Sequence, residues 1–540
     1  MRRSLALLGQ RFRRDRLQLV LWTVGTALLA YLSFVGVAES YGTEQDRTSL
    51  LAAALANPVI LLFRGLPSGA GEGAFTVFLI LPWLAILAAF MSTFLAVRHT
   101  RMEEEVGRAE LVAATPASRL LPVGATAAEG VTANAALAGL VALAHLAVGM
   151  PLDGSLLVGA TVGAVGITFL GVALVAAQLM RTSRAANSLA VWITVGTFVL
   201  AGIGNAIGTP SDDLTRMQSS WLTWLSPFGW AENTRAFDEN LWWPMLVCLG
   251  VGLVLTWVAL ALASVRDVGE SFIAERRGRA EASAGLSSPT ALVWRLTRGA
   301  VLGWMVGGFL TGMLATTLAS VVADVGADNP AVEEILTQIA GGGDVEQATV
   351  TVFFTMLGVL AACCAVQIVC RARQEEAHGT AEPVLSTPVA RVRWFADYLV
   401  VAFVGILLVV AAAIGAAAIG IAGQGGGRWD LMPDVLVTGG GQAVAASVFL
   451  ALTALVFVIA PRLTIGLGWT LVLLGMTLGL FGPLFGFPEW LTELSPVAVA
   501  PKVEGDEIDL AGLWWLVLAA GAGSALALGL MRRRELAPAG

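Results

Sequence analysis

Long apolar stretches without charged residues recur along the whole chain and are separated by short polar segments. Each is about as long as the roughly 20 apolar residues that cross a bilayer as a helix. The pattern predicts twelve spans, at 18–38, 75–97, 123–149, 155–180, 187–207, 243–264, 299–323, 350–370, 398–422, 435–460, 463–485 and 511–531. The fold class expected is therefore an all-α polytopic membrane protein with about twelve transmembrane helices.

The basic residues provide an independent test of this span count. If the N-terminus is cytoplasmic, 26 of the 32 Lys and Arg residues lie in cytoplasmic segments. The others lie outside, and they are Arg47, Arg64, Arg216, Arg235, Arg428 and Lys502. Such an excess on one side is typical of cytoplasmic loops. We therefore expect a multi-pass protein of the cytoplasmic (plasma) membrane with both termini in the cytoplasm.

Two segments outside the spans have their own patterns. Residues 1–16 place Leu5, Leu8 and Phe12 on one face among arginines, which predicts an amphipathic helix lying in the membrane interface. Residues 265–298 are charged and rich in Ser, Ala and Gly, as a cytoplasmic linker is. We therefore divide the chain into an interfacial helix (1–16), a first six-span half (17–264), this linker (265–298) and a second six-span half (299–540).

The two halves are repeats of one another. Residues 101–119 align without gaps onto residues 373–391, with 10 of 19 positions identical. Three further matches keep the same order in both halves: WTVG (22–25) and WMVG (304–307), WLTWLSP (221–227) and WLTELSP (490–496), ALALASVRD (259–267) and ALALGLMRR (525–533). Because each half has an even number of spans, both begin on the same side of the membrane, and the repeats are parallel.

The most informative repeat is the loop after the second span of each half. Its shared residues are Glu103, Glu104, Gly107, Glu110, Thr115, Pro116 and Arg119, repeated as Glu375, Glu376, Gly379, Glu382, Thr387, Pro388 and Arg391. They predict a short acidic helix that ends at Thr-Pro. Identical acids at identical offsets indicate one surface presented twice, as two identical soluble subunits would need; a solvated helix without a partner is the alternative. Pro383 should break or delay the second helix, so we expect unequal sites.

The charge content excludes several functions. With 13% charged residues, a net charge of -7 and no basic tail, the chain is an unlikely partner for nucleic acid. Its one lysine, Lys502, does not lie in the G-x-x-x-x-G-K-[ST] loop that holds nucleotide phosphates, so any ATP must bind to another polypeptide. Three histidines, with no Cys or His cluster and no nucleophile beside a base, predict neither an enzyme nor a metal site.

Ionisable residues are almost absent from the predicted spans. Glu129 and His145 in the third span are the exceptions, and Asp397 lies just ahead of the ninth. Proton-driven carriers usually place acids at the membrane midplane, so an ion-coupled secondary transporter of a hydrophobic solute is the weaker alternative. A sodium-coupled carrier that uses backbone carbonyls stays open. A path without buried charge favours hydrophobic or amphipathic cargo.

The repeated acidic loop, the two six-span halves and the external WLTxLSP segments resemble those of ABC-2-type permeases. The likeness is closest to actinobacterial exporters of polyketide antibiotics, of the tetronasin-resistance type. It implies the permease subunit of an ATP-driven (ABC) exporter that moves compounds such as antibiotics out across the cytoplasmic membrane. Two copies of a separate ATPase would bind ATP and Mg, and this chain would bind no cofactor. The repeated loops would be coupling helices, with Glu104, Glu110, Arg119, Glu376, Glu382 and Arg391 transmitting motion.

The resemblance also implies an external gate and a substrate path. The gate would lie in the segments 208–242 and 486–510, with Trp221, Pro227, Trp230, Glu232, Trp490 and Pro496. Candidate path contacts are the aromatic residues Trp22, Phe34, Phe90, Phe94, Trp192, Phe198, Trp304, Phe309, Phe353, Phe354 and Trp469. Anchoring at the membrane interface explains the tryptophans of the external segments equally well. Lipid contact or helix packing is the alternative for each aromatic residue on a span.

Overall fold

The computed structural model describes residues 2–56, 58–115, 118–273, 286–326, 345–423, 429–480, 488–504 and 507–535. The chain divides into two compact units, Met1–Arg277 and Gly278–Gly540, and each is described by itself. The described residues contain twelve helices that are long and apolar enough to cross a membrane, one for each predicted span. Across those residues the strands amount to two short antiparallel pairs, so the all-α class is confirmed.

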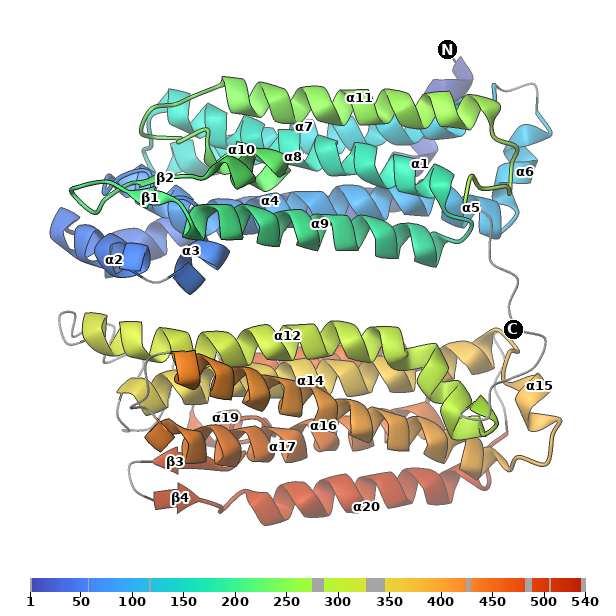
Figure 1. Ribbon diagram of the computed structural model, residues 1–540. Coiled ribbons are helices and arrows are strands. Elements are labelled where there is room, and N and C mark those ends of the chain that lie inside the picture. The colour runs from blue at the N-terminus through green and yellow to red at the C-terminus, as the bar shows by residue number, and fades with distance from the viewer. Residues whose placement is uncertain are drawn as a thin grey trace. The chain divides into compact units, whose positions relative to one another are not determined.

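The first unit is built from six long helices, which Figure 1 draws in blue to light green. They are α1 (Arg2–Ser40), α4 (Glu72–His99), α7 (Leu121–Ala147), α8 (Leu152–Leu179), α9 (Ser183–Ala206) and α11 (Trp243–Val265). Helix α8 lies at the centre and packs against α4, α7, α9 and α11. Small residues permit this close packing: a Cβ on Gly163 of α8 would lie 3.0 Å from the backbone oxygen of Asn134 on α7.

Short elements close the two ends of the first unit. At one end α5 (Arg101–Glu105) and α6 (Arg108–Ala113) form the loop after the second span. At the opposite end lie α2 (Glu44–Ala56), α3 (Pro58–Arg64), β1 (Thr209–Pro210) and β2 (Met217–Gln218) (Figure 1). From this end η1 (Trp221–Leu225) leads into α10 (Pro227–Glu232), which packs among α4, α8, α9 and α11. The sequence pattern did not predict α2 and α3, because they are too short and too mixed in polarity to resemble a span.

The second unit repeats this plan. Its long helices are α12 (Pro289–Gly326), α14 (Val345–Ala377), α16 (Arg391–Gly423), α17 (Met432–Ile459), α18 (Thr464–Leu480) and α20 (Leu513–Met531). Its short elements are α15 (Glu382–Leu385), η3 (Trp429–Leu431), η4 (Pro461–Leu463), α19 (Glu489–Thr492), β3 (Lys502–Glu504) and β4 (Glu507–Asp509). The fourth span α17 packs against α14, α16 and α20, as α8 packs against α4, α7 and α11. The two units therefore share one order of helix packing.

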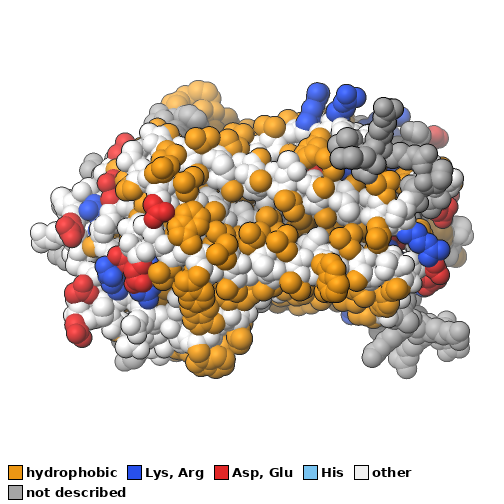
Figure 2. Space-filling model, turned by 90° about the horizontal axis from the view of Figure 1, so that it is seen from above, with side chains coloured by type: hydrophobic (Ala, Val, Ile, Leu, Met, Phe, Trp, Pro, Cys, Tyr) orange, Lys and Arg blue, Asp and Glu red, His pale blue; other side chains and the backbone are white. Residues whose placement is uncertain are grey.

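Two boundaries differ from those expected. Helix α1 runs unbroken from Arg2 to Ser40, so residues 2–16 form no separate helix ahead of the first span. Whether the first turns of α1 lie in the membrane interface stays a prediction. Helix α12 begins at Pro289, inside the segment assigned to the linker. On the face shown in Figure 2, hydrophobic side chains cover the middle of the helices and charged side chains gather at their ends, as membrane-spanning helices require.

Candidate functional site

The loop after the second span turns at a glycine in both units. Gly107 separates α5 from α6 with φ 76°, and Gly379 follows α14 with φ 73°. Glycine adopts this left-handed conformation without the steric penalty that other residues pay. In the second loop α15 is only four residues long and has Pro383 in its first turn. It begins at Glu382, two residues later in the repeat than α6, which begins at Arg108. Pro383 thus delays the second helix, as predicted.

Glu104 of the first loop is turned inward. Its carboxylate accepts a hydrogen bond from Nη1 of Arg101 (2.8 Å) and contacts both terminal nitrogens of Arg266, with Nη1 at 3.0 Å from Oε2. Arg266 directly follows α11, the sixth span. The side chains of Glu104 and Arg266 are only 12% and 7% exposed. This pair, which we call the first tie, fastens the loop to the end of the sixth span.

The second unit repeats this arrangement with Glu376. Nη2 of Arg534 lies 2.6 and 2.7 Å from the two carboxylate oxygens of Glu376, and Nη1 of Arg373 lies 3.1 Å away. Arg534 follows α20, the sixth span of this unit. We call the Glu376–Arg534 pair the second tie. The sequence analysis predicted neither arginine as a partner of the loop. The match between ALALASVRD and ALALGLMRR also places Arg266 opposite Arg532, and not opposite Arg534.

The other predicted loop residues occupy more open positions. Glu110, Thr115, Arg119, Glu382, Thr387, Pro388 and Arg391 are exposed, whereas Glu103 and Glu375 are half-buried. Pro116 lies outside the described residues. Glu103 contacts Nη2 of Arg14 (2.8 Å) on α1, and Arg119 pairs with Asp267 (3.2 Å). The exposed face of each loop is therefore made by the outer residues, and Glu104 and Glu376 face into the unit.

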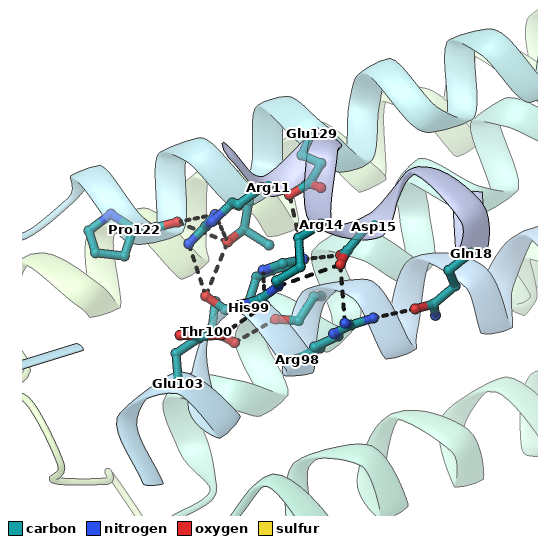
Figure 3. Close-up of polar contacts among 12 residues, drawn as sticks. Arg11, Arg14, Asp15, Gln18, Arg98, His99, Thr100, Glu103, Pro122 and Glu129 are labelled. Carbon is teal, nitrogen blue, oxygen red and sulfur yellow. Dashed lines mark hydrogen bonds and ion pairs between the residues drawn. The ribbon is translucent and has the colours of Figure 1, made fainter. Parts of the chain in front are cut away.

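A buried charged cluster joins α1, α4 and α7 beside the first loop (Figure 3). His99 Nε2 contacts Asp15 Oδ2 and lies 3.7 Å from Glu129 Oε2. Arg98 pairs with Asp15 (Nη2 to Oδ1, 3.2 Å), and Arg11 donates to the Thr126 hydroxyl (2.7 Å). Both carboxylate oxygens of Glu129 are buried without a hydrogen-bond partner. Sequence reasoning had noticed only Glu129 here, because Asp15 and His99 lie outside the predicted spans.

Asp15, His99 and Glu129 offer three possible metal-ligand atoms within 4.8 Å of one another. Two observations oppose a cation at this position. Three arginines surround the cluster, namely Arg11, Arg14 and Arg98. Arg14 Nη2 also lies 3.2 Å from His99 Nδ1. Because a guanidinium only donates, Nδ1 must accept, and Nε2 keeps the proton that it donates to Asp15. The cluster is better explained as an ion-pair network that fixes α1 against α4 and α7.

A cavity of about 620 Å³ opens between this cluster, the first loop and the end of α11. Apolar residues make up part of its walls, and its charged lining residues are Arg11, Arg14, Glu103, Glu104, Arg108, Arg119, Arg266 and Asp267. A volume of this size is within the range of small-molecule binding pockets. The first loop therefore carries a recess as well as an exposed face.

In the external segment of the first unit, Glu232 is buried beneath the short helices. Its Oε2 accepts a hydrogen bond from Nδ2 of Asn205 at 2.5 Å, and burial raises its pKa to about 7. The chain crosses above it at Gly65 with φ 106°, where a Cβ would lie 2.9 Å from Cγ of Pro82 and 3.4 Å from Glu232 Oε1. Only glycine fits there. Glu232 thus lies inside the unit, at the end of α10, and not on its surface.

The other predicted gate residues have mixed positions. Trp221 and Trp490 are 71% and 67% exposed, Pro227 is buried in the first turn of α10, and Trp230 and Pro496 are half-buried. Trp230 Nε1 donates to the backbone oxygen of Trp224 (2.7 Å). The two exposed indoles fit interfacial anchoring as well as they fit a gate, so the gate stays a prediction.

The aromatic residues proposed for the substrate path divide into two groups. Phe34, Phe198 and Phe354 are buried within their own units. The rest are half-buried or exposed: Trp22, Phe90, Phe94, Trp192, Trp304, Phe309, Phe353 and Trp469. Only this second group is placed to contact a substrate without prior rearrangement of its unit.

Comparison with known proteins gives concordant results. The family model described as "Multidrug efflux system permease Rv1217c, C-terminal domain" matches residues 5–262 and 286–532, one stretch in each unit. The multidrug efflux system permease protein Rv1217c of Mycobacterium tuberculosis (strain ATCC 25618 / H37Rv) is 34% identical to this chain over 543 residues. That alignment covers 99% of this chain and 95% of the relative.

Proposed function

The chain belongs to the Rv1217c family of multidrug efflux permeases, and we propose that it is the membrane-spanning subunit of an ATP-driven (ABC) exporter. The observation that carries the ATP-driven part is the doubled loop. Two loops that share their glycine turn, their acids and their inward tie are suited to receive two copies of one partner. The lone lysine, outside any phosphate-binding loop, supports placing ATP and Mg on that partner.

The partner would be a separate ATPase that contacts the exposed outer face of each loop. Glu110 and Arg119 of the first loop and Glu382 and Arg391 of the second are the charged residues available there. The cavity beside the first loop gives one ATPase copy a recess into which a side chain can insert. Because α15 is shorter than α6 and begins later, the two copies would bind with unequal affinity.

The substrate and the setting follow from the same assignment. Twelve apolar helices of a drug-efflux permease suit hydrophobic or amphipathic compounds, antibiotics among them, moved out across the cytoplasmic membrane. Both termini would be cytoplasmic, which agrees with the excess of arginine in the loops on that side. Within the wider family, the tetronasin-resistance type of exporter is the one we propose.

An experiment on energy coupling separates this proposal from the ion-coupled alternative. The chain and its copurifying partners would be placed in proteoliposomes, and ethidium transport would be measured with Mg-ATP or with an imposed proton or sodium gradient. Transport that requires ATP and resists collapse of the gradients supports the ABC exporter. Transport by the chain alone, driven by a gradient and indifferent to ATP, would establish a secondary transporter instead.

A further inference from the structure

Each unit fixes its loop to the end of its sixth span by a buried Glu–Arg pair, in which the two glutamates hold equivalent positions of the repeat and the two arginines do not. We infer that Glu104 and Glu376 are positioning residues that transmit the motion of the loop to the fourth and sixth spans, an inference that rests on the proposed ATP-driven function. They would act through the first and second ties and not by touching the ATPase.

In the first unit the tie reaches the fourth span as well as the sixth. Nε of Arg266 donates to Oε1 of Gln178 at 2.8 Å, and Nε of Arg101 donates to the backbone oxygen of Ala177 at 3.0 Å. Both acceptors lie in the last turn of α8. Glu104 therefore holds together three elements that are distant in the sequence: the loop, the end of α8 and the end of α11.

The second unit makes the same three-way junction with different chemistry. The guanidinium of Arg534 lies 4.5 Å from the ring centroid of Phe457, in the last turns of α17. Phe457 is fully buried, so this cation–π contact is shielded from water. Arg534 also accepts, through its backbone oxygen, a hydrogen bond from Arg391 at the end of the loop (3.1 Å). The second tie therefore joins the loop, α17 and α20.

The ion pairs between each loop and its sixth span differ in burial, and only the buried pairs are strong enough to transmit motion. Glu104, Arg266, Glu376 and Arg534 are each at most 12% exposed, and breaking such a pair leaves an uncompensated charge inside the protein. The Arg119–Asp267 pair links the same two segments of the first unit, but its side chains are 67% and 76% exposed. Exposed pairs contribute little and separate readily. A displacement of the loop would therefore move the sixth span with it, because the tie connects the two.

The test uses the complex with its ATPase, purified from native membranes and reconstituted in proteoliposomes. E104Q and E376Q break the ties from the loop side, and R266Q and R534Q break them from the sixth-span side. ATP hydrolysis and ethidium transport are measured on each preparation, together with the ATPase content per chain. We expect ATPase content and hydrolysis to be retained, and ethidium moved per ATP to fall by about 5- to 150-fold, the usual range of coupling between sites.

Matched controls are E270Q and E535Q, which change exposed glutamates close to the two arginines of the ties. They should keep the wild-type ratio of transport to hydrolysis. Uncoupling by E104Q but not by R266Q would mean that Glu104 does not act through the first tie and would overturn the inference. Wild-type coupling in all four tie variants would overturn it too, while leaving the ATP-driven function intact. A wild-type complex without ATP-dependent transport would instead refute the proposed function itself.

Discussion

Glu232 gives the sharpest test of how this fold treats a buried charge. The residue lies outside the twelve spans, is 8% exposed, and receives a side-chain hydrogen bond from Asn205. Burial raises its pKa from 4.5 to about 7 against the opposing effect of that bond. The substitution E232Q removes the charge and keeps the shape, and the new amide oxygen can still accept from Asn205.

The expected magnitude follows from the shift in pKa. A rise from 4.5 to about 7, at about 1.4 kcal/mol per unit, corresponds to about 3 kcal/mol. Because the folded protein holds this proton more tightly than the unfolded chain, the contribution of Glu232 to the free energy of unfolding is highest below pH 4.5. It falls as the pH rises from 4.5 to about 7 and is constant above that. In E232Q this fall should be absent, so the variant should be about 3 kcal/mol more stable than wild type at pH 8 and equal to it near pH 4.5.

The assay is denaturant or thermal unfolding of the purified protein in detergent, at intervals between pH 4.5 and 8.5. The quantity compared is the difference between E232Q and wild type at each pH, because other groups contribute equally to both. E493Q changes an exposed glutamate in the matching external segment of the second unit and should show no such trend. A difference between E232Q and wild type that stays constant across this pH range would show that burial does not raise the pKa of Glu232.

Three other variants test separate parts of the structure. In the charged cluster, D15N removes the charged partner of Arg98 and His99 and should lower the free energy of unfolding by about 3–5 kcal/mol. E129Q breaks no hydrogen bond and should lower it little. Equal unfolding midpoints for the two variants would contradict the ion-pair network. G107A forces a left-handed turn on alanine and should cost about 1–2 kcal/mol, visible as an earlier melting transition; an unchanged transition would show that the turn is not held there. F198A should destabilise the first unit by about 3–5 kcal/mol, because Phe198 is buried. W192A changes an exposed residue and should leave the melting temperature unchanged; if Trp192 lines the path, it should alter ethidium transport alone. The reverse pattern would assign packing to Trp192 and substrate contact to Phe198.

The spans could be predicted from the sequence because the membrane imposes one rule on every helix that crosses it. Uncharged stretches of about 20 residues have almost no other use, and all twelve were found in place. The repeat was equally visible, since Gly107 and Gly379 keep the same left-handed turn at the same offset. These features depend on local composition, which a single sequence contains in full.

The ties could not be predicted, because they join segments far apart in the chain. Glu104 was recognised as a repeated acid, but an acid on a short helix is compatible with a docking face or with an inward pair. Only packing decides between these, by placing the end of α11 beside α5. The partner of Glu376 was harder still, because Arg532, Arg533 and Arg534 are consecutive and only Arg534 reaches it.

The charged cluster was missed for a different reason. Arg11, Asp15 and His99 flank the apolar stretches, where charged residues normally face water or lipid headgroups. In the structure α1 crosses beside α4 and α7 at this level and buries all three side chains. The pattern of hydrophobic positions along one helix does not show which other helices pack against it. The same limit applies to Glu232, which the sequence placed in an external gate and the structure buries.

The most direct test of the central claim is the composition of the native complex. Native mass spectrometry of the chain purified from its own membranes would count the ATPase copies bound to it, with the E110R/E382R double variant measured alongside. We predict two ATPase copies per chain and the loss of both from the double variant, and we expect the wild-type complex to lose its two copies in separate steps as salt is raised. A chain that is purified without any ATPase, or that keeps both copies when Glu110 and Glu382 are reversed, would contradict it.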